Sequence, residues 1–483
     1  MHGVMIAGTH SGCGKTTATL GILAALRRKG LEVQSFKAGP DFIDSGLHRL
    51  ITGRHSRNLD IWMCGQDEVV ATFRTHSADA GISVVEGAMG LYDGRFSTAS
   101  LARLLGLPVI LVIDAYGMAE SAGAVARGFA EYGKQYTENS PLPPFDKGKV
   151  GGFIAGIIFN RVASESHFER LKKSVRGIPV LGYLPRDPGF EIPHRHLGLV
   201  VAEESPLAAE NIDRLADAVL KHMDVDAIVG ATLCGRPALG SHTGSPPHEI
   251  NPPSPGGGLK IAVAMDKAFC FYYEDNLDTL RAAGAEIIRF SPLAGHGIPE
   301  DADAVYIGGG YPELHAEELS GNLPMLASVH EWAESGRPLY AECGGLMYLS
   351  KGIHDFDGRF FKMAEVFPFE TQMKRGKAHL GYREVFLNRD CILGPKGALC
   401  RGHEFHYSEI KGSNELQITS NELKDKNRAN SSLSLCYSLR DSSGHSLPDE
   451  GYCVKKTLAS YIHLHFGSNS GIGEHFIKFI KES

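Results

Sequence analysis

The chain has 483 residues, enough for two or three domains at roughly 150 residues each. Its hydrophobic share of 43% and charged share of 22% are typical of a globular protein, and a net charge of −7 argues against a nucleic-acid partner. No stretch approaches the roughly 20 apolar residues of a membrane span, and the first residues lack the pattern of a signal peptide. The nine cysteines include no C-x-x-C pair, so we expect no disulfide framework, no zinc site and a cytoplasmic location.

In the first half, short β-branched runs alternate with amphipathic helical patterns. A first strand is expected at Gly3–Ala7 and a first helix at Lys15–Lys29. Further buried strands are expected at Ser83–Val85, Val109–Ile113, Ile154–Phe159 and Val180–Tyr183. Continuous apolar strands between helices predict a parallel sheet covered on both faces.

A stretch rich in Pro, Gly and Ser at 236–258 predicts a linker between a domain at 1–235 and a domain at 259–483. The strand–helix alternation then restarts, which predicts a second α/β domain with elements at Lys260–Ala264, Asp275–Ala283, Glu286–Phe290 and Ala304–Ile307. Two polar, weakly patterned segments, 138–149 and 411–446, are expected to be mobile loop insertions without a chemical role.

The sequence VMIAGTHSGCGKTT has the order strand, glycine-rich turn and helix start that a phosphate loop requires. Thr9 stands where the usual motif has its first glycine, so the loop is one residue longer; the alternative is a glycine-rich turn that only begins a helix. The longer loop resembles that of dethiobiotin-synthetase-like ATPases, which activate carboxylates as acyl phosphates. The residues expected to bind ATP are Gly12, Gly14, Lys15, Thr16 and Thr17, with the Thr16 hydroxyl as a ligand of Mg²⁺.

Acidic residues follow the predicted strands of this domain, where ligands bind in open α/β sheets. Glu86 is a candidate Mg²⁺ ligand, because Mg²⁺ prefers carboxylates together with phosphate oxygens. Asp41, Asp44 and Asp93 are candidates for binding a metal or orienting substrate, and the alternative for each is a helix cap or turn former. Asp114 is either an acid of the Walker B type or a strand terminator.

The run PLYAECGGL predicts a strand that stops at Cys343 and turns sharply into a helix. This is the cysteine version of a nucleophile elbow, which needs small residues such as Ala341 and Gly345 on either side. A helix N-terminus lowers the pKa of a thiol from about 8.5 toward neutrality, so we expect Cys343 to be a reactive thiolate.

Three glycines, Gly308, Gly309 and Gly310, follow another predicted strand and suit an oxyanion hole built from backbone N–H groups. A flexible turn is the alternative. The catalytic base is expected to be His463, from the late segment SYIHLHF, which matches the Y-[LIV]-H pattern of class I glutamine amidotransferases. His465 stands where that class usually has glutamate, so a Cys–His dyad without an aligned carboxylate is predicted. His403 and His406 form a second histidine cluster, either metal-binding or, as we favour, close to the glutamine pocket or a domain interface.

Together these motifs resemble the cobyrinic acid a,c-diamide synthase family of cobalamin biosynthesis, over nearly the whole chain apart from the linker and the insertions. The matching segments include FKAGPDFID, NLDIWM, VEGAMGLYDG, HRHLGLV, AFCFYYEDNLDTL, GGGYPELHAEELS, YAECGG, RGHEFHYS and SYIHLHF. The departures are Phe42, where the family more often has tyrosine, Ala341, where the usual elbow has glycine, and His465.

The resemblance implies a fold with an N-terminal P-loop domain and a C-terminal class I glutamine amidotransferase domain. It implies that the C-terminal domain hydrolyses L-glutamine, with Cys343 as nucleophile and His463 as base. ATP and Mg²⁺, held by Lys15, Thr16 and Glu86, then activate the a and c acetate carboxylates of cob(II)yrinate, near Asp41, Asp44 and Asp93. Relatives use hydrogenobyrinate or nickel-sirohydrochlorin instead, and a homodimer is possible.

Two other classes of protein remain open at this stage. One is a nucleotide-binding regulator or partitioning ATPase with a degenerate glutaminase module, and an intact Cys343 and His463 argue against it. The other is a hydrolase that uses Cys343 on a different acyl group, with the N-terminal half as an ATP-dependent gate.

Overall fold

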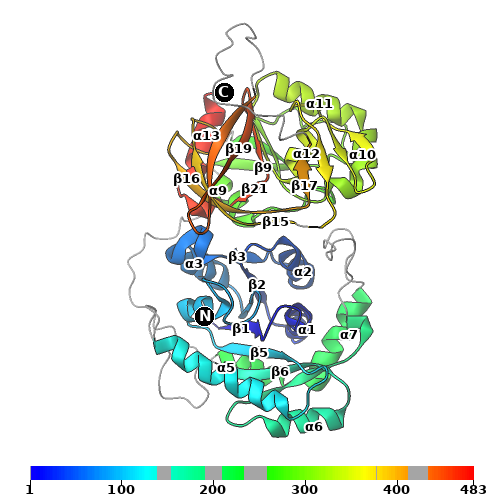
Figure 1. Cartoon of the computed structure of the whole chain (residues 1–483), viewed down its shortest axis with the longest axis vertical. Coiled ribbons are helices and arrows are strands. Elements are labelled where there is room, and N and C mark those ends of the chain that lie inside the picture. The colour runs from blue at the N-terminus through cyan, green and yellow to red at the C-terminus, as the bar shows by residue number, and fades with distance from the viewer. Residues whose placement is uncertain (1, 139–153, 191–208, 233–257, 377, 412–432) are drawn as a thin grey trace. The chain divides into compact units, whose positions relative to one another are not determined.

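A computed structural model describes residues 2–138, 154–190, 209–232, 258–376, 378–411 and 433–483 (Figure 1). The chain forms two compact units, Met1–Pro247 and His248–Ser483, which are described separately. The predicted linker at 236–258 lies outside the described residues except for its last position, and so does the predicted insertion at 138–149 after Glu138. No helix in the described ranges is long and apolar enough to cross a membrane.

The first unit is built on a seven-stranded parallel sheet with the order β3-β2-β4-β1-β5-β6-β7. The predicted strands are all present and extend by one to three residues. The parallel sheet is therefore confirmed. The strands are β1 (Gly3–Gly8), β2 (Val33–Ala38), β3 (Arg57–Leu59), β4 (Ile82–Glu86), β5 (Val109–Asp114), β6 (Ile154–Val162) and β7 (Val180–Pro185).

Helices cover both faces of this sheet. Successive strand residues such as Val4 and Met5 point to opposite faces, and each face packs into its own hydrophobic core. One face packs against α1 (Lys15–Arg28), α2 (Phe42–Thr52), α7 (Ala209–His222) and α8 (Val225–Thr232). The other face packs against α3 (Ile61–Ser77), α4 (Thr98–Leu105), α5 (Ser121–Glu138) and α6 (Glu165–Ser174). This arrangement leaves the carboxyl ends of the strands as the edge where functional loops gather.

The second unit contains a ten-stranded mixed sheet with the order β21-β16-β15-β18-β19-β20-β11-β10-β8-β9. Its parallel part consists of β8 (Leu259–Ala264), β9 (Ala285–Phe290), β10 (Ala304–Ile307), β11 (Leu339–Glu342) and β20 (Thr457–Ser460). Its antiparallel part consists of β15 (His379–Leu387), β16 (Leu399–His406), β18 (Ser434–Asp441), β19 (Ser446–Val454) and β21 (Ile462–Leu464). The predicted α/β character of this half is confirmed.

Helices lie on both faces of the parallel part. One face packs against α9 (Glu274–Ala282) and α13 (Ile472–Lys481), and the other against α10 (Ala316–Gly321), α11 (Leu323–Glu334) and α12 (Gly344–Leu349). A four-stranded sheet follows α12 and contains β12 (Gly352–His354), β13 (Phe360–Lys362), β14 (Thr371–Met373) and β17 (Ser408–Ile410). Short 3₁₀ turns are η1 (Pro188–Phe190), η3 (Pro312–His315) and η5 (Phe466–Ser468).

The prediction of a mobile insertion at 411–446 is wrong for its last part. Residues Ser434–Asp441 form β18, which pairs with both β15 and β19. The strand has the sequence SLCYSLRD and is only partly buried. Its mixed polar and apolar sequence therefore resembles that of a loop. Residues 412–432 lie outside the described part of the chain.

One pair of cysteines departs from the sequence-based expectation. Cys436 on β18 and Cys453 on β19 form a disulfide. They are 17 residues apart in the sequence, and only the antiparallel pairing of the two strands makes them neighbours. The expectation of no disulfide is therefore wrong at this pair, while Cys343 is a free thiol.

Candidate active sites

The phosphate-loop segment forms the predicted strand, turn and helix. Gly12 and Gly14 have φ values of 81° and 90°, which glycine adopts without the strain that a side chain would add. A Cβ on Gly14 would clash with the amide of Asn160, and the Asn160 Nδ2 donates to the Cys13 carbonyl over 3.0 Å. The loop is therefore clamped against the end of β6. At the start of the loop, the Thr9 N–H donates to the Val112 carbonyl of β5 over 3.2 Å.

A cavity of about 570 Å³ opens beside this loop. All five residues predicted to bind ATP line it, and Lys15 is buried. Arg186 and Tyr116 also line the cavity, and the Arg186 guanidinium lies 4.6 Å from the centre of the exposed Tyr116 ring. The complete lining is Gly12, Gly14, Lys15, Thr16, Thr17, Tyr116, Asn160, Arg161, Pro185, Arg186, Asp187, Pro188 and Phe190.

The predicted metal ligands Thr16 and Glu86 are in direct contact. The Thr16 hydroxyl donates to Glu86 Oε1 over 2.7 Å and approaches Asp44 Oδ2 at 3.3 Å. Two residues that the sequence analysis did not assign complete the cluster. Lys37 on β2 pairs with Asp44 and lies 2.9 Å from Glu86, while His48 on α2 contacts the other Glu86 oxygen at 2.8 Å. Lys37 lies in the segment FKAGPDFID together with Asp41 and Asp44, whereas His48 lies beyond that segment.

This cluster holds more negative than positive charge. Burial alone would lower the pKa of Lys37, but the carboxylates of Asp44, Glu86 and Asp41 outweigh it and raise that pKa. Burial opposes the ionisation of Glu86, yet Lys37 and His48 hold its pKa well below the usual range. Burial and the carboxylates of Asp41 and Glu86 raise the pKa of Asp44. Hydroxyl and carboxylate oxygens with surplus negative charge form a donor set that suits Mg²⁺.

The remaining acids have structural partners. Asp41 is the N-cap of α2 and accepts the N–H groups of Ile43 and Asp44 over 3.0 and 2.9 Å. Asp93 accepts the Gly90 N–H over 2.9 Å within a turn. Asp114 accepts the Tyr116 N–H and pairs with Arg161 at 2.6 Å, which is the arrangement of a strand terminator. These contacts are those of the helix-cap and turn alternatives, and of the three only Asp41 approaches Lys37, at 3.8 Å.

A Glu86→Gln substitution should weaken metal-dependent nucleotide binding. We expect the Mg²⁺ concentration for half-maximal binding of a fluorescent ATP analogue to rise by about 10-fold or more, because an ionic oxygen ligand is lost. Glu120→Gln is the matched control and should leave this concentration unchanged, because Glu120 pairs with Arg170 and does not line the cavity. An unchanged Mg²⁺ requirement in Glu86→Gln, or an equal increase in the control, would contradict the assignment.

Cys343 lies at the sharp turn between β11 and α12, as predicted. Its φ of 48° and ψ of −103° are an uncommon conformation for a residue with a side chain, and strain of this kind is typical of nucleophile elbows. The turn has no room for larger neighbours, because a Cβ on Gly345 would clash with the Ile307 carbonyl. A Cβ on Gly344 would lie 2.9 Å from Pro312 and 3.1 Å from the Gly310 nitrogen.

The prediction of a thiolate at Cys343 is not supported by its surroundings. Its side chain is only 5% exposed, and burial raises the pKa of the thiol, with Glu313 adding to the increase. The Gly344 N–H opposes this shift, but α12 is only six residues long and its N-terminus does not outweigh the burial. Burial also lowers the pKa of His463 well below its usual value, and neighbouring His403 and His406 lower it further. Both groups are therefore neutral at neutral pH in the free protein.

The three-glycine turn follows β10 beside His463. A Cβ on Gly309 would clash with the imidazole of His463, so this glycine permits the close approach of the ring. Two of the three N–H groups already have partners: Gly308 donates to the Tyr272 hydroxyl over 2.7 Å and Gly309 to the Phe271 carbonyl over 3.2 Å. Gly310, with φ 155°, is the member of the turn whose nitrogen lies nearest the elbow.

His463 occupies the middle of β21, opposite His403 on β16. The two imidazoles stack with their centres 4.9 Å apart, and the Tyr273 hydroxyl contacts His403 Nδ1 at 2.7 Å. The elbow and this strand are joined through the backbone, because the Cys343 N–H donates to the Ser460 carbonyl over 2.7 Å. The structure therefore brings the nucleophile, the glycine turn and the predicted base into one buried region.

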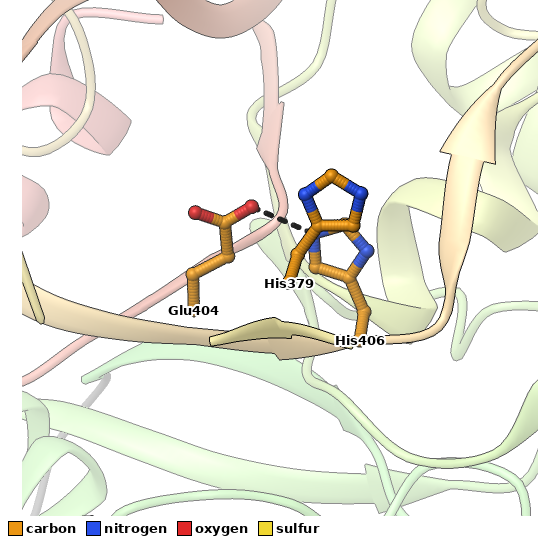
Figure 2. A group of neighbouring side chains, drawn as sticks. All are labelled: His379, Glu404 and His406. Carbon is orange, nitrogen blue, oxygen red and sulfur yellow. Dashed lines mark hydrogen bonds and ion pairs between the residues drawn. The ribbon is translucent and has the colours of Figure 1, made fainter. Parts of the chain in front are cut away.

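His406 belongs to a neighbouring cluster with His379 and Glu404 on the paired strands β15 and β16 (Figure 2). His406 Nε2 contacts Glu404 at 2.8 Å and its Nδ1 contacts the Ser408 carbonyl at 2.7 Å. The Glu404 carboxylate and the Ser408 carbonyl thus provide a partner within the protein for each ring nitrogen of His406. Arg383 also holds Glu404, at 2.6 Å. The metal-binding alternative for this cluster is therefore not favoured.

The neutral state of Cys343 can be tested by its reaction with iodoacetamide. Because burial raises the pKa of the thiol, the labelling rate of Cys343 should rise about tenfold for each pH unit between 7 and 9. Peptide mass spectrometry measures the rate at this residue, and Cys343→Ala identifies its signal. A rate independent of pH between 6 and 8 would instead indicate a thiolate paired with an imidazolium.

Comparison with known proteins gives matches over both units. Residues 4–200 match the CobQ/CobB/MinD/ParA nucleotide binding domain, and residues 260–471 match the CobB/CobQ-like glutamine amidotransferase domain. The chain is 40% identical to the cobyrinate a,c-diamide synthase of Syntrophotalea carbinolica, over 99% of this chain and 98% of the relative. It is 39% identical to that of Listeria monocytogenes, over 100% of both chains, and 36% identical to that of Salmonella typhimurium, over 99% and 97%.

The two units therefore define a glutamine-hydrolysing carbon–nitrogen ligase with a nucleotide-binding P-loop domain and a class I glutamine amidotransferase domain. This confirms the predicted fold class and enzyme class. Because relatives of this identity align over the full length of the chain, it belongs to the cobyrinate a,c-diamide synthase family. The resemblance stated from the motifs is confirmed.

Proposed function

We propose that the chain amidates the a and c acetate carboxylates of cob(II)yrinate, using ATP and ammonia released from L-glutamine. The observation that carries this proposal is the presence of two complementary sites on one chain. One is a phosphate loop beside a surplus of buried carboxylates, and the other is a strained Cys343 elbow beside a buried His463. Curated relatives with this function align with the chain from end to end.

In the ATP-dependent half-reaction, a ring carboxylate attacks the γ-phosphorus of ATP, which gives an acyl phosphate and ADP. Ammonia then attacks the acyl carbon, and phosphate leaves. Lys15 and the loop N–H groups suit the β and γ phosphates, whereas Thr16 and Glu86 would hold Mg²⁺, which neutralises the charge that develops on the phosphoryl oxygens. Lys37 lies beside Asp44 and Glu86 and keeps both carboxylates in place. The cavity wall at Tyr116 and Arg186 suits the nucleoside.

In the glutaminase half-reaction, His463 accepts the proton of Cys343 as the sulfur attacks the glutamine side-chain carbonyl. The carbon–nitrogen bond breaks, the proton passes to the leaving ammonia, and a thioester remains. Water then hydrolyses the thioester, which releases glutamate and restores the thiol. Because Gly308 and Gly309 already have partners for their N–H groups, Gly310 is the most suitable oxyanion donor of the turn.

The ring carboxylates are expected to bind beside the acidic residues that follow the strands of the first unit. The candidates near the acceptor carboxylates are Asp44, Asp41 and Asp93, and the partners of the last two are those of a helix cap and a turn. Asp44 is the acid of the three that contacts the Thr16 hydroxyl, so it is the one placed to act on the activated carboxylate. Hydrogenobyrinate and nickel-sirohydrochlorin present similar carboxylates and are the alternative acceptors for the same chemistry.

Cys343→Ala should abolish amidation that depends on glutamine but retain amidation supplied with ammonium salts. The thiol is needed only to release ammonia, so the ATP-dependent site stays intact in this variant. Mass spectrometry of the ring product, measured with each nitrogen source, checks the expectation. Loss of both activities would show that Cys343 is structural, and retention of both would exclude it as the nucleophile.

Lys15→Ala should remove amidation with glutamine and with ammonium alike, because neither nitrogen source replaces phosphate binding. Lys29→Ala is the matched control. Lys29 lies just beyond the end of the same helix, where it pairs with Asp226, and it does not line the cavity. Wild-type rates are expected for this control. Full ammonium-dependent activity in Lys15→Ala would contradict the assignment of the phosphate loop.

A further inference from the structure

The residue before the nucleophile carries a buried carboxyl group. Glu342 ends β11 and is 1% exposed. Its Oε1 accepts the Tyr340 hydroxyl over 2.6 Å and the Leu464 N–H over 3.1 Å, and its Oε2 accepts the Tyr306 hydroxyl over 3.0 Å. None of these donors carries a charge. The carboxyl is thus fixed on both oxygens, but its negative charge is not neutralised by these three partners.

The fourth neighbour of this carboxyl is the predicted base. His463 Nδ1 lies 3.9 Å from Glu342 Oε2. Leu464, which donates to the other oxygen, directly follows His463 in β21. The carboxyl therefore fixes the backbone beside the imidazole and lies on the side of Nδ1.

Other class I amidotransferases usually have a glutamate at the position that His465 occupies in this chain. The nitrogens of the His465 ring face Gly467 and Asp275. The Gly467 N–H donates to His465 Nδ1 over 3.1 Å, and His465 Nε2 lies 4.0 Å from Asp275. Glu404 is a second carboxylate near His463, but Arg383 and His406 hold it. Glu342 is the carboxylate with an oxygen directed at the base.

We propose that Glu342 is the positioning carboxylate of His463, supplied from the position before the nucleophile instead of two residues after the histidine. This inference rests on the proposed glutaminase function. Glu342 keeps the Nδ1–H tautomer and stabilises the imidazolium that forms when the thiol proton moves to Nε2. Glu342 is ionised when this imidazolium forms and does not take a proton from it.

The electrostatics of the site agree with this role. Burial raises the pKa of Glu342 to about 7. A nearby positive charge would therefore shift this group toward its ionised form near neutral pH. The charged or titratable groups that face His463 are Glu342 from β11 and His403, Glu404 and His406 from β16. The two histidines disfavour an imidazolium and Glu404 favours it, and an ionised Glu342 at 3.9 Å would add to that stabilisation.

Glu342→Gln removes the charge at nearly constant volume and is the direct test. Glutamate release should fall about 100-fold in kcat, with the KM for glutamine changed by no more than about threefold, since only the transition state gains charge. Ammonium-dependent amidation should be unchanged. The acidic limb of the kcat/KM profile should move to lower pH, because the imidazolium loses its neighbouring anion. A purely structural role would not move this limb.

Glu450→Gln is the matched control for removal of an enclosed carboxyl group in the same unit. Glu450 accepts the Ser460 hydroxyl over 3.0 Å and the Tyr461 N–H over 2.6 Å, and burial raises its pKa to about 7 as well. Its variant should keep the wild-type pH profile. An identical shift in both variants would overturn the specific role of Glu342.

Glu342→Asp keeps the charge but withdraws it by one methylene, and it should recover at least about tenfold of the lost kcat. Loss of ammonium-dependent amidation in Glu342→Gln would indicate a folding defect in that variant. Glu342→Asp then provides the test, and a reduced glutaminase rate with full ammonium-dependent activity would support the inference. Wild-type glutamate release in Glu342→Gln would overturn the inference and leave the proposed function standing. Absence of Cys343-dependent glutamate release from the wild-type protein would instead refute the proposed function.

Discussion

The backbone conformation of Cys343 is the constraint on which the glutaminase site depends. A residue with φ 48° and ψ −103° is strained by about 1–3 kcal/mol and persists only where its surroundings over-determine it. The surroundings do so here through the Ser460 carbonyl, the absence of side chains at Gly344 and Gly345, and the turn after β10. The same contacts hold the nucleophile near the three glycines, while the pairing of β21 with β16 positions His463.

The sites of the two units differ in their charge. In the first unit, three carboxyl groups surround Lys37 and Thr16, and the resulting surplus of negative charge prepares the site for a divalent cation and phosphate. In the second unit, burial raises the pKa of Cys343 and lowers that of His463, which favours the neutral form of both groups. A neutral thiol is a weak nucleophile, so this arrangement limits the wasteful reactions of an otherwise strained cysteine.

Local signals in the sequence were sufficient for the parallel parts of both sheets, the phosphate loop and the elbow, because each depends on contiguous residues. They were insufficient where the answer depended on distant partners. The pairing of β18 with β15 and β19 placed Cys436 beside Cys453, and a polar strand resembled a loop. The neutral state of Cys343 depends on burial by the whole fold, and the roles of Lys37 and Glu342 depend on contacts across 49 and 122 residues.

The most direct test of the account is mass spectrometry of cob(II)yrinate incubated with the protein, Mg-ATP and glutamine labelled at its amide nitrogen. Two successive replacements of a carboxylic hydroxyl by the labelled amino group, each accompanied by one ADP and one glutamate, are the predicted result. Release of labelled ammonia without any change in cob(II)yrinate would contradict the assigned acceptor, and hydrogenobyrinate and nickel-sirohydrochlorin would then be the rings to compare. Neither glutamate nor ADP formation with any of the three would contradict the ligase itself.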